Sequence, residues 1–236
     1  MHALNCPNCG AALPAHFAKA EVLSCDFCGT TFRASKTITP EPDMGTLLLS
    51  ADFGSRVMPG WEALNEDKLT FHKGRPSELR GVFAPQVNSY YVLKSSGLLD
   101  NFDASVNIKF TKGDEERVRG GFYVRFTPEG GYGFLISAQA SYTFGSFMKD
   151  EKGNLVFQKI MAWAYHSALL PGLHKSNRLR VICNRDSFRV YLNGVLAASF
   201  RDSNFSAGKL YLAVEPSEKS KMGVAFSDLQ LREVPK

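Results

Sequence analysis

Apolar and polar residues alternate with a period of two in several short segments of this chain. This period places every second side chain on one face of a β-strand, so each segment is expected to be a strand with one buried face. The clearest apolar triplets are Val106, Ile108 and Phe110; Phe122, Val124 and Phe126; Leu179, Val181 and Cys183; Phe188, Val190 and Leu192; and Leu210, Leu212 and Val214. No segment shows the periodicity of an amphipathic helix of three turns. The pattern therefore predicts an all-β protein.

Turn-forming residues separate these segments at intervals of roughly 8 to 12 residues, the spacing typical of β-sandwiches. They occur at 128–131, at 150–153, at 184–186 and at Asn193-Gly194. The Asn-Gly pair suits the type I′ turn of a tight hairpin. A body of this length with many short strands predicts two packed antiparallel sheets in a jelly-roll arrangement.

Four cysteines near the start of the chain form two Cys-x2-Cys pairs. Cys6 and Cys9 make the first pair, Cys25 and Cys28 make the second, and fifteen residues separate the pairs. At this spacing, two short knuckles can bring four thiolates to one tetrahedral Zn²⁺ ion. We therefore expect Zn²⁺ as a structural cofactor and a zinc ribbon over residues 1–33. The pattern resembles the bacterial zinc ribbons of the CPxCG type.

A redox-active dithiol and a pair of disulfides are the alternative interpretations of these cysteines. A thioredoxin-like dithiol would need a strand before the motif and a helix after it, and neither pattern is present. A catalytic zinc ion is not expected, because four thiolates fill the coordination sphere and leave no position for water. The predicted metal site is therefore structural.

The segment after the cysteines has the composition of a semi-extended tether. Residues 34–43 include Pro40 and Pro42 and show no apolar periodicity. A domain boundary is expected here. The predicted division is a zinc ribbon at 1–33, a linker at 34–45 and a β-sandwich at 46–236.

Composition excludes several classes of protein. With 236 residues, 44% of them hydrophobic and 22% charged, the chain is typical of a globular protein and not of a disordered or fibrous one. Its longest apolar stretches are far shorter than the roughly 20 residues that cross a bilayer, so no membrane span is predicted. The start of the chain lacks the cationic and apolar parts of a secretory signal, which predicts a cytoplasmic protein with reduced cysteines.

The formal net charge of +5 raises the question of nucleic-acid binding. The excess is diffuse, because residues 1–45 hold three cations and four acids and no long run of like charges occurs. Phosphate binding needs clustered cations, since it depends on counterion release. Nucleic acid is therefore not the expected partner, and nucleic-acid binding through the ribbon is kept as a third hypothesis.

Three segments in the last third of the chain follow one another in a recognisable order. They are a strand at 177–183, a Tyr-Leu-Asn-Gly hairpin at 188–194 and a Gly-x-Leu-x-Leu strand at 205–212. This order resembles the concanavalin A-like lectin and glucanase superfamily, and within it the domain of unknown function also labelled 3-keto-disaccharide hydrolase. The resemblance spans about residues 48–233. It implies a concanavalin A-like β-sandwich with a sugar as ligand or substrate.

Sequence motifs for catalysis are absent from the chain. Glycosidases of this superfamily carry the clustered acids Glu-x-Asp-x-x-Glu, because hydrolysis needs an acid and a nucleophile close together. No such cluster occurs here, and the motifs of serine hydrolases, zinc proteases and P-loop proteins are missing as well. No catalytic residue is assigned. Only folding could bring together the scattered acids Asp100, Asp103, Asp150, Glu151 and Glu215.

Sugar recognition would use an aromatic platform with a few polar groups on one sheet face. Trp163 and Tyr165 share one face of their segment. Tyr142 could join them, and so could Tyr123 and Arg125, which lie on the face opposite Phe122, Val124 and Phe126. Of these side chains, we expect Trp163, Tyr165, Tyr142 and Arg125 to bind the ligand. The alternative is that the aromatic residues fill the core of the sandwich.

The first functional hypothesis is a non-catalytic intracellular binding or scaffolding protein. Its zinc ribbon would dock a protein partner, and its β-sandwich would bind a protein or a carbohydrate. The closed metal site and the missing catalytic acids favour this interpretation. The alternative, implied by the resemblance, is a glycoside or keto-sugar hydrolase whose acids assemble on the concave face of a sheet.

Overall fold

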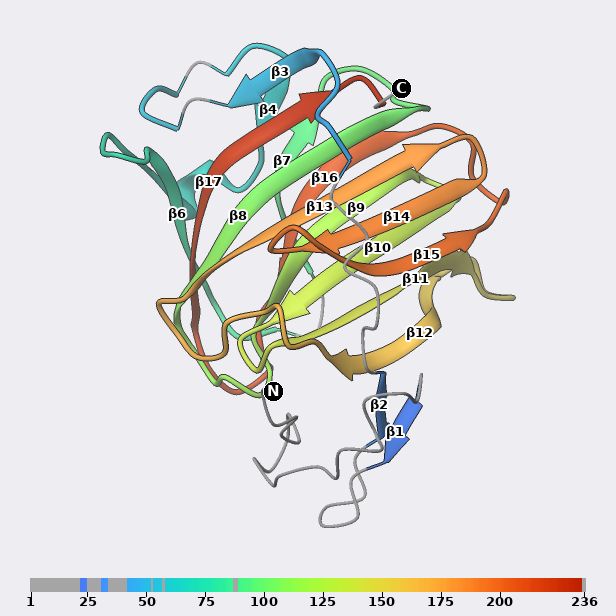
Figure 1. Ribbon diagram of the computed structural model, residues 1–236. Helices are drawn as coiled ribbons and strands as arrows, with labels where there is room; N and C mark the ends of the chain where they lie inside the picture. The colour runs from blue at the N-terminus through green and yellow to red at the C-terminus, as the bar shows by residue number, and fades with distance from the viewer. Residues whose placement is uncertain are drawn as a thin grey trace.

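The computed structural model shows a β-sandwich of two antiparallel sheets (Figure 1). The prediction of an all-β protein with two facing sheets is confirmed. In the described part of the chain, the single helical element is a 3-10 turn, Glu66–Lys68, and no helix there is long and apolar enough to cross a bilayer. The described residues are 22–24, 31–33, 42–51, 53–56, 58–86 and 89–234.

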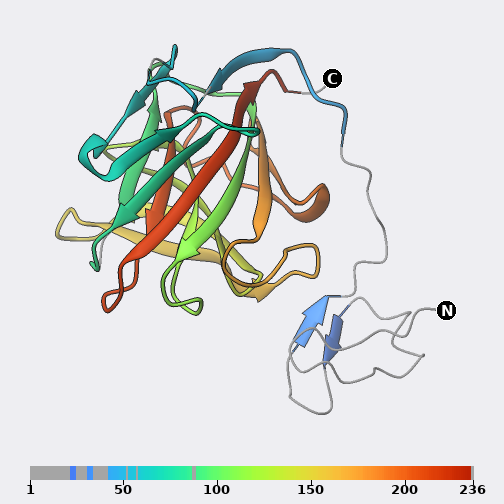
Figure 2. The ribbon, with the colours of Figure 1, turned by 90° about the vertical axis from the view of Figure 1, so that its left-hand side faces the viewer.

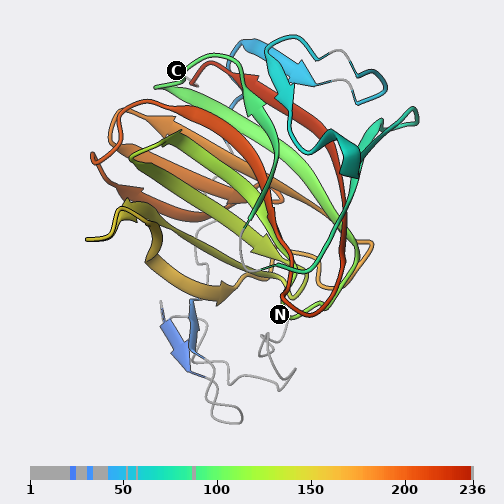
Figure 3. The same ribbon diagram turned by 180° about the vertical axis from the view of Figure 1, so that it is seen from behind.

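The first sheet has seven strands. They are β4 (Trp61–Ala63), β7 (Tyr90–Ser95), β9 (Arg119–Thr127), β10 (Gly130–Ser137), β11 (Ser141–Lys149), β12 (Leu155–Tyr165) and β16 (Lys209–Glu215). Their order across the sheet is β12-β11-β10-β9-β16-β7-β4, so β12 and β4 form its edges (Figure 3). The central strands β9, β16 and β7 come from distant parts of the chain.

The second sheet has eight strands and faces the viewer in Figure 1. They are β3 (Leu47–Ala51), β5 (Leu69–His72), β6 (Glu78–Phe83), β8 (Phe102–Lys112), β13 (Ser176–Asn184), β14 (Ser187–Leu192), β15 (Val195–Arg201) and β17 (Met222–Arg232). The order is β15-β14-β13-β8-β17-β6-β5, with β3 added beside β17. A separate antiparallel pair joins β1 (Val22–Ser24) to β2 (Thr31–Arg33).

The core between the two sheets is built from the apolar side chains that the alternation predicts. In β8, Val106 and Ile108 are fully buried and Phe110 is nearly so, whereas the intervening Asn107 and Lys109 are partly exposed. The same alternation holds in β13, β14 and β16, whose apolar triplets all belong to the main core. Removing these side chains from water is the main driving force for packing the two sheets.

Phe126 departs from the predicted alternation. Phe122 and Val124 lie in the main core, but Phe126 packs in a second apolar cluster on the outward side of the seven-stranded sheet. Arg125, the residue before it, has a φ of 49°, and the pairing of β9 with β16 shifts register at this point. The left-handed residue interrupts the two-residue period of the strand. A side chain predicted for the core therefore faces outward.

Residues 42–46 lead into β3 along the outward face of the eight-stranded sheet (Figures 1 and 2). The carbonyl of Pro42 accepts a hydrogen bond from Arg180 Nη1 (3.0 Å), and the carbonyl of Gly45 accepts one from Arg232 Nη1 (3.0 Å). The last residues of the predicted linker, 34–45, are therefore held against β13 and β17. The predicted division into domains stays a prediction, because most of the chain before Pro42 lies outside the described residues.

Candidate functional site

Seven aromatic side chains gather on the outward face of the seven-stranded sheet. They come from β7, β9, β11, β12 and β16, and they form an apolar cluster separate from the main core. We call this surface the aromatic face. Its rings are those of Tyr91, Tyr123, Phe126, Phe147, Phe157, Trp163 and Tyr211.

The register of the sheet explains why rings from different strands meet. Tyr211 on β16 lies opposite Tyr123 on β9, and Phe147 on β11 lies opposite Phe157 on β12. Residues opposite each other in neighbouring strands point to the same face of the sheet. Side chains that are far apart in the sequence are therefore neighbours on this surface.

Two paired glycines make room for the rings. Gly133 on β10 lies opposite Gly145 on β11. A Cβ atom at Gly133 would lie 2.9 Å from the Phe147 ring and 3.2 Å from the Phe157 ring, which is closer than side chains ordinarily approach. Because glycine has no Cβ, both rings can lie directly over the sheet.

The rings of the aromatic face pack against one another. The ring centroids of Tyr123 and Phe147 are 4.7 Å apart, and those of Tyr91 and Tyr211 are 5.0 Å apart, within the range of favourable aromatic pairs. Tyr123 is fully buried and Phe126 is 7% exposed, whereas the other rings are only half-buried. The aromatic face is thus a packed layer whose outer rings are accessible from solvent.

Polar groups lie at one end of the aromatic face. The Tyr123 hydroxyl donates to Glu215 Oε1 (2.9 Å) and lies 2.6 Å from Ser89 Oγ. Arg119 Nη1 is 3.7 Å from Glu215 Oε2, and the Arg119 guanidinium carbon is 4.8 Å from the centre of the Trp163 ring. Burial, reinforced by the negative charge of Glu215, holds the pKa of Tyr123 well above its usual value. The phenol therefore stays protonated and remains a hydrogen-bond donor.

A small cavity of about 220 Å³ opens at this polar end, beside Arg119 and Glu215. Hydrogen-bond donors and acceptors therefore lie next to an apolar layer, which is the combination that small-molecule sites use. The cavity is also lined by Gln86, Arg117, Pro216, Ser217 and Glu218.

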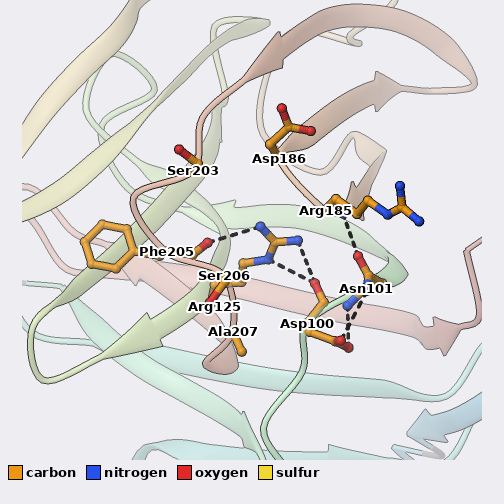
Figure 4. A pocket seen from close by; sticks show the side chains of 9 residues that line it. All are labelled: Asp100, Asn101, Arg125, Arg185, Asp186, Ser203, Phe205, Ser206 and Ala207. Carbon is orange, nitrogen blue, oxygen red and sulfur yellow. Dashed lines mark hydrogen bonds between the residues drawn. The ribbon is translucent and has the colours of Figure 1, made fainter.

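A larger cavity, of about 460 Å³, lies elsewhere on the sandwich and is bordered by Arg125 (Figure 4). Arg125 donates from Nε and Nη2 to the carbonyl of Asp100 (3.0 and 2.7 Å) and from Nη1 to the carbonyl of Phe205 (3.1 Å). The guanidinium therefore ties two loops to β9. The full lining is Asp100, Asn101, Arg125, Arg185, Asp186, Ser203, Phe205, Ser206 and Ala207.

Of the four side chains predicted to bind the ligand, Trp163 lies on the aromatic face. Tyr165 packs against the main core, and Tyr142 is 7% exposed and donates its hydroxyl to the carbonyl of Ala197 (2.8 Å). Arg125 is 1% exposed and borders the larger cavity. The structure does not bring these four side chains together. Their role in binding stays a prediction, which we carry forward for Trp163.

Sequence reasoning named Trp163 and Tyr123 and missed the other five rings of the aromatic face. A signal existed for Tyr211, which stands between the core residues Leu210 and Leu212 and therefore points away from the core. The neighbours of Tyr211 on this face could not be inferred in the same way, because they depend on the order of the strands in the sheet.

The acids considered for catalysis are dispersed over the molecule. Glu215 lies on the aromatic face, whereas Asp103 belongs to a buried ion pair in the eight-stranded sheet. Asp150 and Glu151 lie in the turn between β11 and β12, and Asp100 borders the larger cavity. Folding therefore does not assemble these acids at one place.

The predicted structural Zn²⁺ is contradicted in the part of the chain that the structure describes. No group of three or more His, Cys, Asp or Glu side chains there could hold a metal ion. The cysteine of this part, Cys183, is buried, and burial raises the pKa of its thiol to about 12, so it does not supply a thiolate ligand. We therefore correct the expectation and assign no metal cofactor. Outside the described residues lie the predicted ligands Cys6, Cys9, Cys25 and Cys28.

Solved structures of low sequence identity share the fold of this protein. The carbohydrate-binding module CBM66 from Bacillus subtilis shares 18% sequence identity, with a TM-score of 0.54 over 74% of this chain and 96% of the module. The β-glucanase of Bacillus licheniformis shares 11% identity, with a TM-score of 0.56 over 81% of this chain and all (100%) of the glucanase chain. A glycoside hydrolase family 16 endo-glucanase from Bacteroides ovatus shares 9% identity, with a TM-score of 0.57 over 78% of this chain and 100% of its own.

These similarities establish a concanavalin A-like jelly roll, and at such low identities they show a shared fold and not a shared function. No known protein family and no curated protein matches the chain. The resemblance to the 3-keto-disaccharide hydrolase domain stays a prediction.

Proposed function

We propose that this protein binds a carbohydrate on the aromatic face. The observation that carries the proposal is the layer of seven rings with Arg119, Glu215 and Ser89 at one end. Sugars present C–H groups that pack on aromatic rings, and their hydroxyl groups bond to polar side chains beside the rings. A carbohydrate-binding module and a β-glucanase are among the similar structures, which supports a sugar as the ligand.

We propose that the sugar is bound without being hydrolysed. A glycosidase needs a general acid whose pKa is raised. Retaining and inverting glycosidases also need a second carboxyl group close to that acid. Glu215 is the one acid of those considered that lies on the aromatic face, and the others lie elsewhere on the described part of the chain. This dispersal favours a binding protein.

The protein partner predicted from the sequence is not part of this proposal. That prediction depended on a metal-bound ribbon, and no metal is now assigned. Carbohydrate is therefore the partner that we propose, and a protein partner stays a prediction.

Binding of glycans to the full chain tests the proposal. A glycan array identifies the strongest ligand, and isothermal titration calorimetry measures its affinity. Tyr211→Ala and Trp163→Ala are each expected to weaken binding about tenfold or more, equivalent to about 1.4 kcal/mol, because each substitution removes one ring that packs on the sugar. Circular dichroism and thermal unfolding show whether each variant is folded.

Val82→Ala is the control variant, because Val82 is 56% exposed on β6 in the other sheet. It is expected to bind the glycan as the unchanged protein does. The proposal is wrong if no glycan on the array binds, or if Tyr211→Ala and Trp163→Ala both bind with unchanged affinity.

A further inference from the structure

We propose that the aromatic face selects acidic polysaccharides, whose sugars carry carboxylate or sulfate groups. This inference rests on the proposed carbohydrate binding and adds the charge of the ligand to it. The strands that carry the rings also carry five cations at outward positions. These cations are Lys94, Arg119, Lys149, Lys159 and Lys209.

The sheet register places two of these cations beside the rings. Lys94 on β7 lies opposite Tyr211, and Lys209 on β16 lies opposite Phe126. Opposed residues point to the same face, so both ammonium groups belong to the surface that the rings form. A sugar lying on these rings would have cations on the side where β7 and β16 run.

Lys159 supplies a cation on the opposite edge of the surface. It follows Phe157 by two positions on β12 and lies opposite Gly145, so it shares the face of the rings. Lys159 is exposed and pairs with no acid in the described part of the chain. Its charge is therefore available to a ligand.

Arg119 offers hydrogen-bond donors at the polar end. Its guanidinium lies over the Trp163 ring, and its nearest acidic oxygen, on Glu215, is 3.7 Å away, beyond hydrogen-bond distance. The side chain is 38% exposed. A planar fork of N–H groups suits a two-pronged contact with a carboxylate or a sulfate.

The charges on this face cancel only in part. Lys94 pairs with Glu62 (2.9 Å), Lys149 pairs with Glu129 (2.7 Å), and Arg119 Nη1 lies 3.7 Å from Glu215 Oε2. Lys209 donates to the neutral carbonyl of Ser96, and Lys159 has no acidic partner in the described part. The face is therefore net positive, and it attracts anionic sugars more strongly than neutral ones of the same shape.

Matched pairs of polymers test this selection. Polygalacturonate is compared with its methyl-esterified form, and dextran sulfate is compared with dextran, so that each pair differs in charge. We expect the full chain to bind at least one acidic polymer tenfold or more tightly than its neutral counterpart at about 50 mM salt. The difference should shrink at about 500 mM salt, because salt screens exposed charges. The preferred acidic polymer identifies carboxylate or sulfate as the recognised group.

Substitutions of single cations locate the effect. Arg119→Gln and Lys159→Gln are each expected to weaken binding of the acidic polymer about threefold to tenfold, and to weaken binding of its neutral counterpart less. Lys73→Gln removes an exposed cation from the turn between β5 and β6 in the other sheet, and should leave the affinity unchanged. If Lys73→Gln and Lys159→Gln weaken binding of the acidic polymer equally, the attraction is non-specific and the inference is wrong.

The outcomes separate this inference from the proposed function. Equal binding of acidic and neutral polymers, with a loss in Tyr211→Ala, would overturn the acidic selection and leave carbohydrate binding intact. If Tyr211→Ala binds the acidic polymer as tightly as the unchanged protein does, the acidic selection by the aromatic face is also wrong, because the polymer would then bind elsewhere. If neither acidic nor neutral glycans bind, the proposed function itself is wrong.

Discussion

Arg180 and Asp103 form an ion pair on the outward side of the eight-stranded sheet, and both side chains are only 2% exposed. Arg180 Nε lies 2.9 Å from Asp103 Oδ1, and Arg180 Nη2 lies 2.6 Å from Asp103 Oδ2. Arg180 also donates to the carbonyl of Pro42. The two buried charges therefore stabilise each other. Arg180 also holds the segment that leads into β3.

Replacing Asp103 alone should strongly destabilise the sandwich. Asp103→Ala removes the buried carboxylate that Arg180 contacts through Nε and Nη2, so we expect the free energy of unfolding to fall by about 3–5 kcal/mol. The double variant Asp103→Leu/Arg180→Met should lose less, because it removes both charges. Urea unfolding followed by circular dichroism measures the free energy of unfolding of the single and the double variant. A single substitution that costs less than about 1 kcal/mol would contradict this account.

At the scale of elements, close approach of strands depends on individual glycines. Gly208, directly before β16, exchanges backbone hydrogen bonds with Leu99 (2.8 and 3.0 Å). A Cβ atom there would lie 2.2 Å from the carbonyl carbon of Arg125 and 2.7 Å from the backbone nitrogen of Phe126. These are backbone atoms of β9, so they cannot move aside as a flexible side chain could.

We expect Gly208→Ala to lower the free energy of unfolding by about 1–3 kcal/mol, since β16 must move away from β9. Gly97→Ala is the matched control, because nothing lies within 4 Å of a Cβ at Gly97. Thermal and urea unfolding of both variants make the comparison. Equal stability of Gly208→Ala and Gly97→Ala would show that the predicted clash is absent.

At the scale of the whole molecule, several buried acids stay protonated at alkaline pH. Burial raises the pKa of Cys183 from 9.0 to about 12. Burial is also the main cause of the raised pKa of Tyr91, Tyr123 and Tyr132, with a hydrogen bond to Asp202 adding to the effect at Tyr132. Each of these groups favours the folded state only while it keeps its proton.

Stability should therefore fall as the pH rises above about 9. Below the pKa of the unfolded chain, the Cys183 thiol is protonated in both states and adds no pH dependence. Between pH 9 and about 12, the unfolded chain releases the proton while the folded protein retains it, which favours unfolding. Cys183→Ala should be less stable at neutral pH because of its cavity, but should lose stability less steeply between pH 9 and 11. Urea unfolding across this pH range tests the slope, and parallel slopes would contradict the assignment.

Much of the fold could be predicted because its signals are local. The alternation in β8 predicted the burial of Val106 and Ile108, and Asn193-Gly194 adopts the two positive φ values, 48° and 83°, that a type I′ turn requires. Phe126 was placed on the wrong side of its strand, because nothing in the sequence marks Arg125 as left-handed.

Less of the candidate site could be predicted. Trp163 was singled out, but it was grouped with Tyr142 and Arg125, whose side chains the fold uses for packing and for holding loops. Aromatic composition alone does not tell a ring in the core from a ring on the outward face. That distinction depends on which strands become neighbours.

The sequence by itself determined the class of fold and the buried faces of β8, β13, β14 and β16, because side-chain alternation is a property of each extended segment. Only the tertiary structure decided that Tyr91, Tyr123 and Tyr211 form one surface. Their strands, β7, β9 and β16, are separated in the sequence and become neighbours only in the folded sheet. The surface that we propose for binding is therefore a consequence of packing between distant segments and not of any local motif.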